Sequence, residues 1–368
     1  MSNNRPRARD LGIAIGHLSP GPLNAITDVP GVQVGHCCLI EEEGPLIPGQ
    51  GPVRTGVTAI LPHSGNLFTD KVCAAVHVIN GFGKSVGFPQ VNELGNIETP
   101  ILLTGTLSTW NVANALVDYM IIQQPDLVSV NPVVGECNDS FLNDIQGRHI
   151  KKEHVFQAIN SASETNLEEG CVGAGVGMTG FGWKGGIGTS SRRPGRDMGQ
   201  YTVGVLTLTN TGSARDLRID GIPFGKHVTP ETESKVEGSI MFVLATDAPL
   251  SARQLGRVAR RVSFGLARIG GTASHGSGDF VIAFTTGNRI SQTGKQSATP
   301  DSLIEEIALS ELFNATIDAT EEAILNSLLR AETTIGRDCN TRRAIPIDRV
   351  EEMLDQYNKT WLFAVSRG

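Results

Sequence analysis

No stretch of this 368-residue chain is apolar over the ~18 residues that a membrane-spanning helix needs. No run of lysines and arginines stands out, and the formal net charge is −7, which argues against a nucleic-acid-binding protein. Residues 1–10 are polar and arginine-rich without an apolar core, so a signal peptide of the usual form is not expected. Together these absences predict a cytoplasmic protein.

The cysteines and histidines lack the spacing of metal ligands. The six cysteines contain no C-x-x-C pair, and the eight histidines have no ligand spacing with one another. We therefore expect free thiols, no disulfide or zinc framework, and no metal or organic cofactor. The G-x-S-x-G, H-E-x-x-H and combined S-x-x-K signatures of common hydrolases are also missing.

Short strands and helices alternate along the chain without a regular βαβ repeat. Glycine is frequent, at 43 residues, which implies many turns and close backbone approaches, above all in the glycine-rich segment 170–188. Continuous apolar strands indicate sheets that are covered on both faces. A layered α/β sandwich in one compact domain, residues 1–368, is therefore predicted. Strands are predicted over 32–34, 55–61, 76–79, 101–103, 202–209, 240–245 and 280–285, and helices over 108–123, 149–161, 252–269, 302–330 and 349–359.

Ser239 stands at an unusual place, between the polar approach 235–237, which ends on Gly238, and the apolar strand 240–245. A glycine at 238 permits a strained backbone, and strain at a Gly-Ser bond can promote attack of the serine hydroxyl on the preceding carbonyl. Hydrolysis of the resulting ester would free an α-amine, which titrates near ~7.7–8.0 and can act as a general base. Taken alone, the local pattern favours a strand that simply begins with Gly-Ser.

Five sequence blocks carry a more specific signal, because they occur in order along nearly the whole chain. They are 24–36 (NAITDVPGVQVGH), 54–62 (RTGVTAILP), 134–136 (VGE) with Asp139 and 142–144 (LND), 237–240 (EGSI) with 245–250 (ATDAPL), and 277–280 (SGDF) with 283–284 (AF). This ordered set resembles the DmpA-type family of L-aminopeptidase/D-esterase-amidases, which includes the β-aminopeptidases.

The resemblance implies a precursor that cuts itself between Gly238 and Ser239 into an α chain, residues 1–238, and a β chain, residues 239–368. It implies an α+β fold, namely a four-layer αββα sandwich that is similar in architecture to Ntn hydrolases but has different connectivity. It also implies assembly into a homotetramer of αβ units.

The implied activity is hydrolysis of the N-terminal residue of small peptides, amides or esters that carry a free amino group, through an acyl-enzyme on Ser239. One alternative is acyl transfer, as in ornithine acetyltransferases, which have a related fold but a threonine nucleophile. A second alternative is a non-enzymatic binding protein. The sequence does not rank L-, D- and β-amino-acid substrates.

The resemblance also assigns roles to individual residues. Ser277 and Asp279 match a serine and an acidic residue that are expected to hydrogen-bond Ser239 and its amine and to orient proton transfer. The acid is aspartate here, whereas some β-aminopeptidases carry glutamate. Asn210 matches an asparagine whose amide helps to bind the oxyanion.

Two further positions concern substrate binding. Glu136 matches a glutamate that binds the free amino group of the substrate, for which a carboxylate is the suitable partner. Asn138 stands where some relatives carry tyrosine and others an aliphatic residue. Its backbone N–H can still face the oxyanion, but the role of its side chain in the pocket is open.

Overall fold

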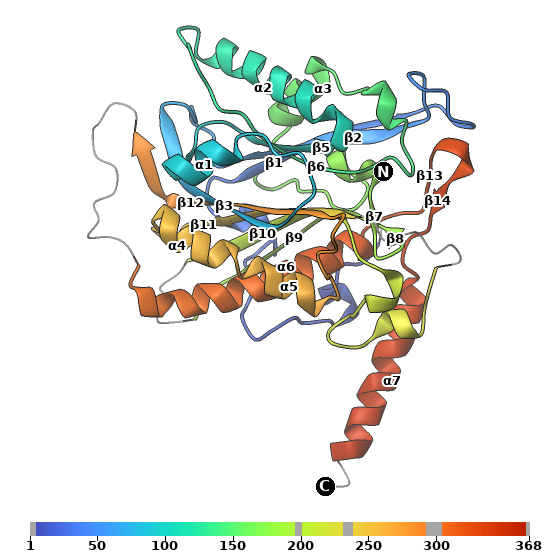
Figure 1. Ribbon diagram of the computed structural model, residues 1–368. Helices are drawn as coiled ribbons and strands as arrows, with labels where there is room; N and C mark the ends of the chain where they lie inside the picture. Colours follow the sequence, from blue (N-terminus) through green and yellow to red (C-terminus); the bar gives the residue numbers. More distant parts are fainter. Residues whose placement is uncertain (1–4, 196–200, 231–237, 292–303, 366–368) are drawn as a thin grey trace.

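The computed structural model describes residues 5–195, 201–230, 238–291 and 304–365, with side chains to residue 357. Its elements stack in four layers (Figure 1). Helices α2 (Thr109–Gln123) and α3 (Lys152–Asn160) cover one sheet. Helices α4 (Ala252–Ala259), α5 (Val262–Arg268) and α6 (Leu309–Leu329) pack below the other. The predicted αββα sandwich is therefore confirmed.

The two inner layers are sheets of different width. The four-stranded sheet has the order β1 (Gln33–Glu41), β2 (Val53–Leu61), β5 (Ile101–Gly105), β6 (Val133–Cys137). The six-stranded sheet has the order β4 (Asn96–Ile97), β3 (Asp70–Gly81), β12 (Gly278–Ser291), β11 (Ser239–Thr246), β10 (Val203–Asn210), β9 (Gly186–Arg192).

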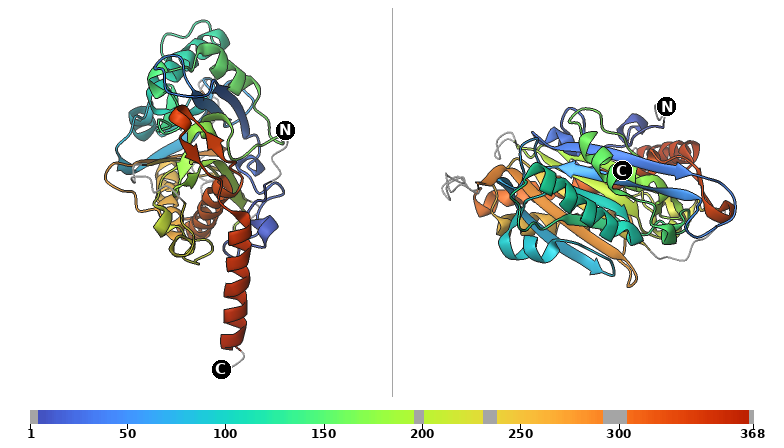
Figure 2. Two further views of the ribbon diagram at one scale, coloured as in Figure 1. Left: turned by 90° about the vertical axis from the view of Figure 1, so that its right-hand side faces the viewer. Right: turned by 90° about the horizontal axis from the view of Figure 1, so that it is seen from above.

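Smaller elements complete the fold. The pair β7 (Thr179–Gly180) and β8 (Trp183–Lys184) and the pair β13 (Thr334–Ile335) and β14 (Thr341–Arg342) form separate two-stranded sheets. The remaining helices are α1 (Phe88–Leu94) and α7 (Ile347–Val365), and α7 projects away from the layers (Figure 2). Among the described residues, no helix is both long and apolar enough to cross a membrane.

Three apolar clusters fill the three spaces between the four layers, and β11 contributes to two of them. Ile240, Phe242 and Leu244 belong to the cluster shared with α4, α5 and α6. Met241, Val243 and Ala245 belong to the cluster between the two sheets. This alternation follows from the two-residue period of a strand, and it explains why the segment is apolar throughout.

The start of β11 is held from both sides. In the antiparallel pairing with β10, Ser239 lies opposite Asn210, and in the parallel pairing with β12 it lies opposite Gly278. The predicted strand at 280–285 is thus longer than expected, since it begins at Gly278. The residues predicted to act with Ser239 are brought to it by this register.

Two predicted elements differ from the structure. The helix predicted over 252–269 is interrupted at Arg260 and Arg261, although its apolar stripe continues in one core on both sides of the break. The helix predicted over 302–330 begins, as an α-helix, only at Leu309, and residues 302 and 303 lie outside the described residues.

The glycine-rich segment 170–188 is not extended throughout, because residues 173–177 form a 3-10 helix. The expectation of close packing is confirmed. A Cβ on Gly175 would lie 2.6 Å from the carbonyl oxygen of Gly170, so only glycine fits at that approach.

Candidate active site

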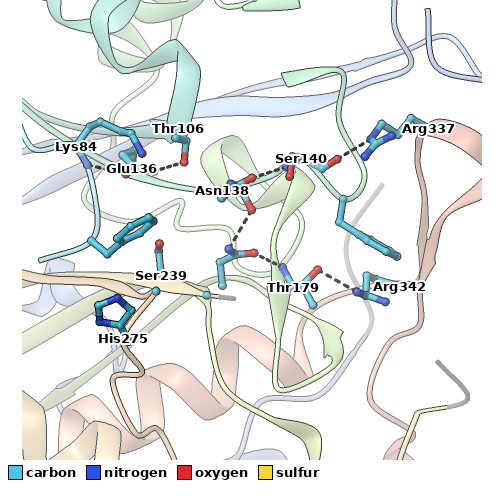
Figure 3. Close-up of a pocket in the computed structure, with 15 residues that line it drawn as sticks. Lys84, Thr106, Glu136, Asn138, Ser140, Thr179, Ser239, His275, Arg337 and Arg342 are labelled. Atoms are coloured by element: carbon cyan, nitrogen blue, oxygen red, sulfur yellow. Dashed lines mark hydrogen bonds between the residues drawn. The ribbon is translucent and has the colours of Figure 1, made fainter. Parts of the chain in front are cut away.

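A cavity of about 670 Å³ lies at the start of β11 (Figure 3). Most of the predicted site residues line it: Glu136, Asn138, Asn210, Gly238 and Ser239. The ends of three strands, β6, β10 and β11, and one loop therefore meet at a single opening.

Ser239 is the first residue of β11, and its side chain is only 6% exposed. The alternation along β11 directs it, like Met241, toward the space between the sheets. Its Oγ accepts a hydrogen bond of 3.3 Å from the Gly278 N–H. Its hydroxyl donates to no other described residue, so the oxygen is oriented while its proton is available for transfer.

Gly238 shows why the serine is preceded by glycine. Its φ does not lie in the left-handed region, so the expected unusual backbone conformation is not found. Instead, a Cβ at this position would lie 2.6 Å from the Cα of Thr211 and 2.7 Å from the carbonyl oxygen of Asn210. The requirement for glycine is therefore a close approach between neighbouring backbones. The predicted polar approach, 235–237, lies outside the described residues.

The side-chain amide of Asn210 is fixed at both ends. Its Oδ1 accepts a 2.7 Å hydrogen bond from the Thr179 N–H, and its Nδ2 donates a 3.0 Å bond to the Asn138 carbonyl. These partners determine which end of the amide is nitrogen. The second N–H of Nδ2 has no described acceptor, so the group can donate to an oxyanion beside Ser239.

Asn138 is exposed, and its side chain stabilises the turn in which the residue lies, because Oδ1 accepts a 2.9 Å hydrogen bond from the Ser140 N–H. This is the local side-chain-to-backbone bond that asparagine favours in turns. The carbonyl of Asn138 positions Asn210. Asn138 thus shapes the cavity wall mainly through its backbone.

Glu136 lies near the end of β6 and is 2% exposed. Its Oε1 accepts a 2.8 Å hydrogen bond from the Lys84 N–H, and its Oε2 accepts one from the Thr106 hydroxyl. Within the described part of the chain, no cationic side chain forms an ion pair with it. A buried carboxylate held only by neutral donors has capacity for an incoming ammonium group.

Ser277 and Asp279 lie beside this cavity but do not line it, and both are fully buried. The Ser277 hydroxyl donates a 2.5 Å hydrogen bond to Asp279 Oδ1, whereas Oδ2 has no described partner. Burial raises the pKa of Asp279 to about 6, against the opposing effect of that hydrogen bond. Their link to Ser239 runs through Gly278, whose N–H contacts the nucleophile candidate.

The cavity also contains residues that the sequence analysis missed. Thr106 follows β5 directly, so its position as a polar residue at the end of an apolar strand was a signal that could have identified it. Thr179, His275, Arg337 and Arg342 carried no comparable signal. Among the described residues, no three His, Cys, Asp or Glu side chains are grouped so that they could hold a metal ion.

Comparisons with known proteins agree over most of the chain. The model of Peptidase family S58 matches residues 24–342. The beta-peptidyl aminopeptidase BapA of Sphingosinicella xenopeptidilytica is 40% identical over 95% of this chain and 91% of its own length.

Solved structures are similar as well. The PH0078 protein from Pyrococcus horikoshii OT3 is 50% identical, with a TM-score of 0.92 over 96% of this chain and 99% of its own. The L-aminopeptidase D-Ala-esterase/amidase from Ochrobactrum anthropi is 37% identical, with a TM-score of 0.88 over 96% and 99%. That protein is described as a new variant of the Ntn hydrolase fold, so the expected Ntn-like architecture is confirmed.

Proposed function

Because this chain belongs to peptidase family S58, we propose that it is a self-processing serine aminopeptidase/amidase with Ser239 as its nucleophile. The observation that carries the proposal is the cavity itself. It combines an oriented serine that follows a tightly packed glycine with a buried carboxylate that has no cationic partner.

Processing starts from the continuous chain. Ser239 Oγ attacks the carbonyl carbon of Gly238, and the peptide nitrogen of Ser239 leaves as the amine while an ester forms. Water then hydrolyses the ester, which gives a Gly238 carboxylate and a free α-amine on Ser239. The products are chains 1–238 and 239–368.

Turnover uses the same atoms. The ammonium group of the substrate binds Glu136, which places the first carbonyl carbon near Ser239. The α-amine accepts the proton of Oγ as it attacks, and Asn210 donates to the oxyanion. The leaving amine takes up the proton, and water releases the acyl group from the ester.

Ser277 and Asp279 act as positioning residues in this scheme. The Ser277 carbonyl accepts hydrogen bonds from the Phe82 N–H at 3.2 Å and from Asn80 Nδ2. This holds the loop whose Lys84 N–H contacts Glu136. The Asp279 carboxylate lies beside Gly278, where its charge can favour proton transfer from Ser239.

The relatives support hydrolysis at the N-terminal residue of peptides, amides or esters, since β-peptidyl aminopeptidase, L-aminopeptidase and D-Ala-esterase/amidase activities stand among their names. Neither the acyltransferase nor the binding-protein alternative gains support from them. The choice among L-, D- and β-substrates is left to experiment, and the tetramer of αβ units and the cytoplasmic location stay predictions.

The proposal is tested on the purified wild-type protein by intact mass and by turnover of L-, D- and β-aminoacyl anilides. Two fragments, beginning at Met1 and Ser239, and release of aniline from at least one class are expected. Added amines should divert little of the acyl group if hydrolysis dominates. A single intact chain with full amidase activity would contradict self-processing.

Processing should depend on pH through Asp279. Because burial raises the pKa of this group to about 6, its carboxylate is protonated below that pH. We expect the cleavage rate of the newly synthesised precursor to fall about tenfold per pH unit below pH 6, as for one group that must be ionised. Cell-free synthesis followed by gel analysis between pH 5 and pH 8 measures this rate, and Asp279→Asn should be slow throughout.

The matched control is Asp139, because burial raises the pKa of that carboxyl to about 6 as well. Asp139→Asn should keep the fall in cleavage rate below pH 6. If that fall disappears in Asp139→Asn and persists in Asp279→Asn, the assignment of the pH dependence to Asp279 is wrong. The raised pKa also means that the folded precursor loses stability as the pH rises from about 4 to about 6, because the carboxyl ionises in the unfolded chain over that range while the buried group keeps its proton. Asp279→Asn should therefore be more stable at pH 7, by up to about 3 kcal/mol.

A further inference from the structure

The cavity has a second charged group, Arg342, which lies across it from Glu136 (Figure 3). Arg342 is the last residue of β14, and the β13–β14 hairpin carries it to the cavity from 103 positions beyond Ser239. An arginine that is only 2% exposed requires a reason, because burying a guanidinium is costly.

The guanidinium is held in one orientation. Its Nε donates a 3.1 Å hydrogen bond to the Thr179 hydroxyl, and its Cζ lies 3.5 Å from the centre of the Phe141 ring. Thr179 in turn donates its N–H to Asn210, so the arginine is connected to the amide beside Ser239. Stacking on an aromatic ring leaves the edge of the guanidinium available to a planar anion.

The two terminal nitrogens of Arg342 have no hydrogen-bond or ion-pair partner among the described residues. They are not sealed from the cavity either, since they are not among the buried polar atoms that lack a partner. Burial lowers the pKa of Arg342 to about 10, so the group keeps its charge at neutral pH. It therefore presents two donors and a positive charge to the open space.

The other cations of the cavity are differently placed. Arg337 forms an ion pair of 2.8 Å with Asp338 and donates to the Ser140 carbonyl at 2.6 Å. Lys84 lies on the Glu136 side, where its backbone N–H contacts that carboxylate. Arg342 is thus the cation that faces the side of Ser239 opposite to the amine site.

We propose that Arg342 binds a carboxylate on the leaving part of the substrate, so that the enzyme prefers short peptides with an anionic group after the scissile bond. This inference rests on the proposed function. An N-terminal residue held by Glu136 presents its carbonyl to Ser239, and the chain must then continue along the free side of the cavity, toward Thr179 and Arg342. An extended dipeptide spans about 7 Å, so its terminal carboxylate is the first anion that can reach this region.

Two kinds of substrate pair test the proposal on the wild-type enzyme. The first kind compares β-Ala-L-Ala and L-Ala-L-Ala with their C-terminal amides, and the second compares Ala-Glu-NH2 with Ala-Gln-NH2. A charge-assisted, two-donor contact predicts a KM lower by about tenfold or more for the anionic member of at least one kind of pair. The first kind reports a terminal carboxylate and the second an acidic side chain.

Arginine variants connect that preference to one residue. In Arg342→Met the KM difference between acid and amide should disappear, and Arg342→Lys should restore part of it. Arg343→Gln, a change at the exposed neighbouring position, should behave as wild type.

The outcomes separate this inference from the proposed function. If the amides are hydrolysed and neither pair favours the acid in the wild type, the inference is overturned while the function stands. It is also overturned if the preference survives in Arg342→Met. If no member of either pair is hydrolysed and the aminoacyl anilides are not cleaved, the proposed function itself fails.

Discussion

Replacing Ser239 with alanine is expected to leave one intact chain of 39.1 kDa whose amidase activity is at least about 10⁴-fold lower. The change removes the oxygen that both cleaves the Gly238–Ser239 bond and forms the acyl-enzyme. Among the residues that the structure describes, only one hydrogen bond, from the Gly278 N–H, is lost with it, so the fold should persist. Intact mass reports processing, and turnover of an aminoacyl anilide reports catalysis.

A matched control is Ser64→Ala, since Ser64 is exposed and does not line the cavity. It should be processed and active like the wild type. Ser239→Cys supplies a second test, because a thiol is also a competent nucleophile and should restore some cleavage. If Ser239→Ala still splits at the same bond, another group attacks Gly238 and the nucleophile is misassigned.

Replacing Glu136 with glutamine should lower kcat/KM for substrates with a free amine by about 100-fold or more, because the ammonium group loses its charged partner in a desolvated site. The side-chain oxygen of the glutamine can still accept a hydrogen bond from the Lys84 N–H. The Thr106 hydroxyl can rotate so that its oxygen accepts a hydrogen bond from the glutamine NH2 group, and the site should therefore keep its shape. The informative measurement is the activity ratio between free-amine and N-acetylated anilides, which should fall toward one.

Processing provides the internal control for this variant. Self-cleavage needs no substrate amine, so Glu136→Gln should still split into two chains. Glu153→Gln, an exposed change on α3, should leave the ratio unaltered. An unchanged ratio in Glu136→Gln would remove Glu136 from amine recognition, and a failure to split would indicate a structural role instead.

The fold could be predicted well where local patterns have a single interpretation. The apolar segment 240–245 is buried on both faces, and such a run indicates a central strand. The division between α4 and α5 could not be seen, because Val258, Ala259, Val262 and Leu266 pack in the same core on both sides of the break. Apolar periodicity reports which face is buried, and it does not register a short interruption of backbone hydrogen bonding.

The site was predictable in part, and for different reasons. Ser239 and Glu136 were identified by the ordered family blocks and Asn210 by its match to a family asparagine, and the structure brings all three to one cavity. The placing of Ser277 and Asp279 behind that cavity depends on strand register, which no local pattern specifies. Arg342 reaches the cavity only because the β13–β14 hairpin folds across the layers, a long-range contact without a local signature.

The position of β11 and β12 has a consequence for the lifetime of the protein. These strands belong to residues 239–368, yet they lie between β10 and β3, which belong to residues 1–238. In the proposed cleavage before Ser239, the same backbone hydrogen bonds and apolar contacts would come to join two molecules instead of two parts of one. Refolding then requires an encounter of separate chains and depends on concentration, whereas the precursor folds as a single chain. A cleaved enzyme would thus be maintained by slow unfolding, and the proposed cleavage would make its assembly a step that is hard to repeat.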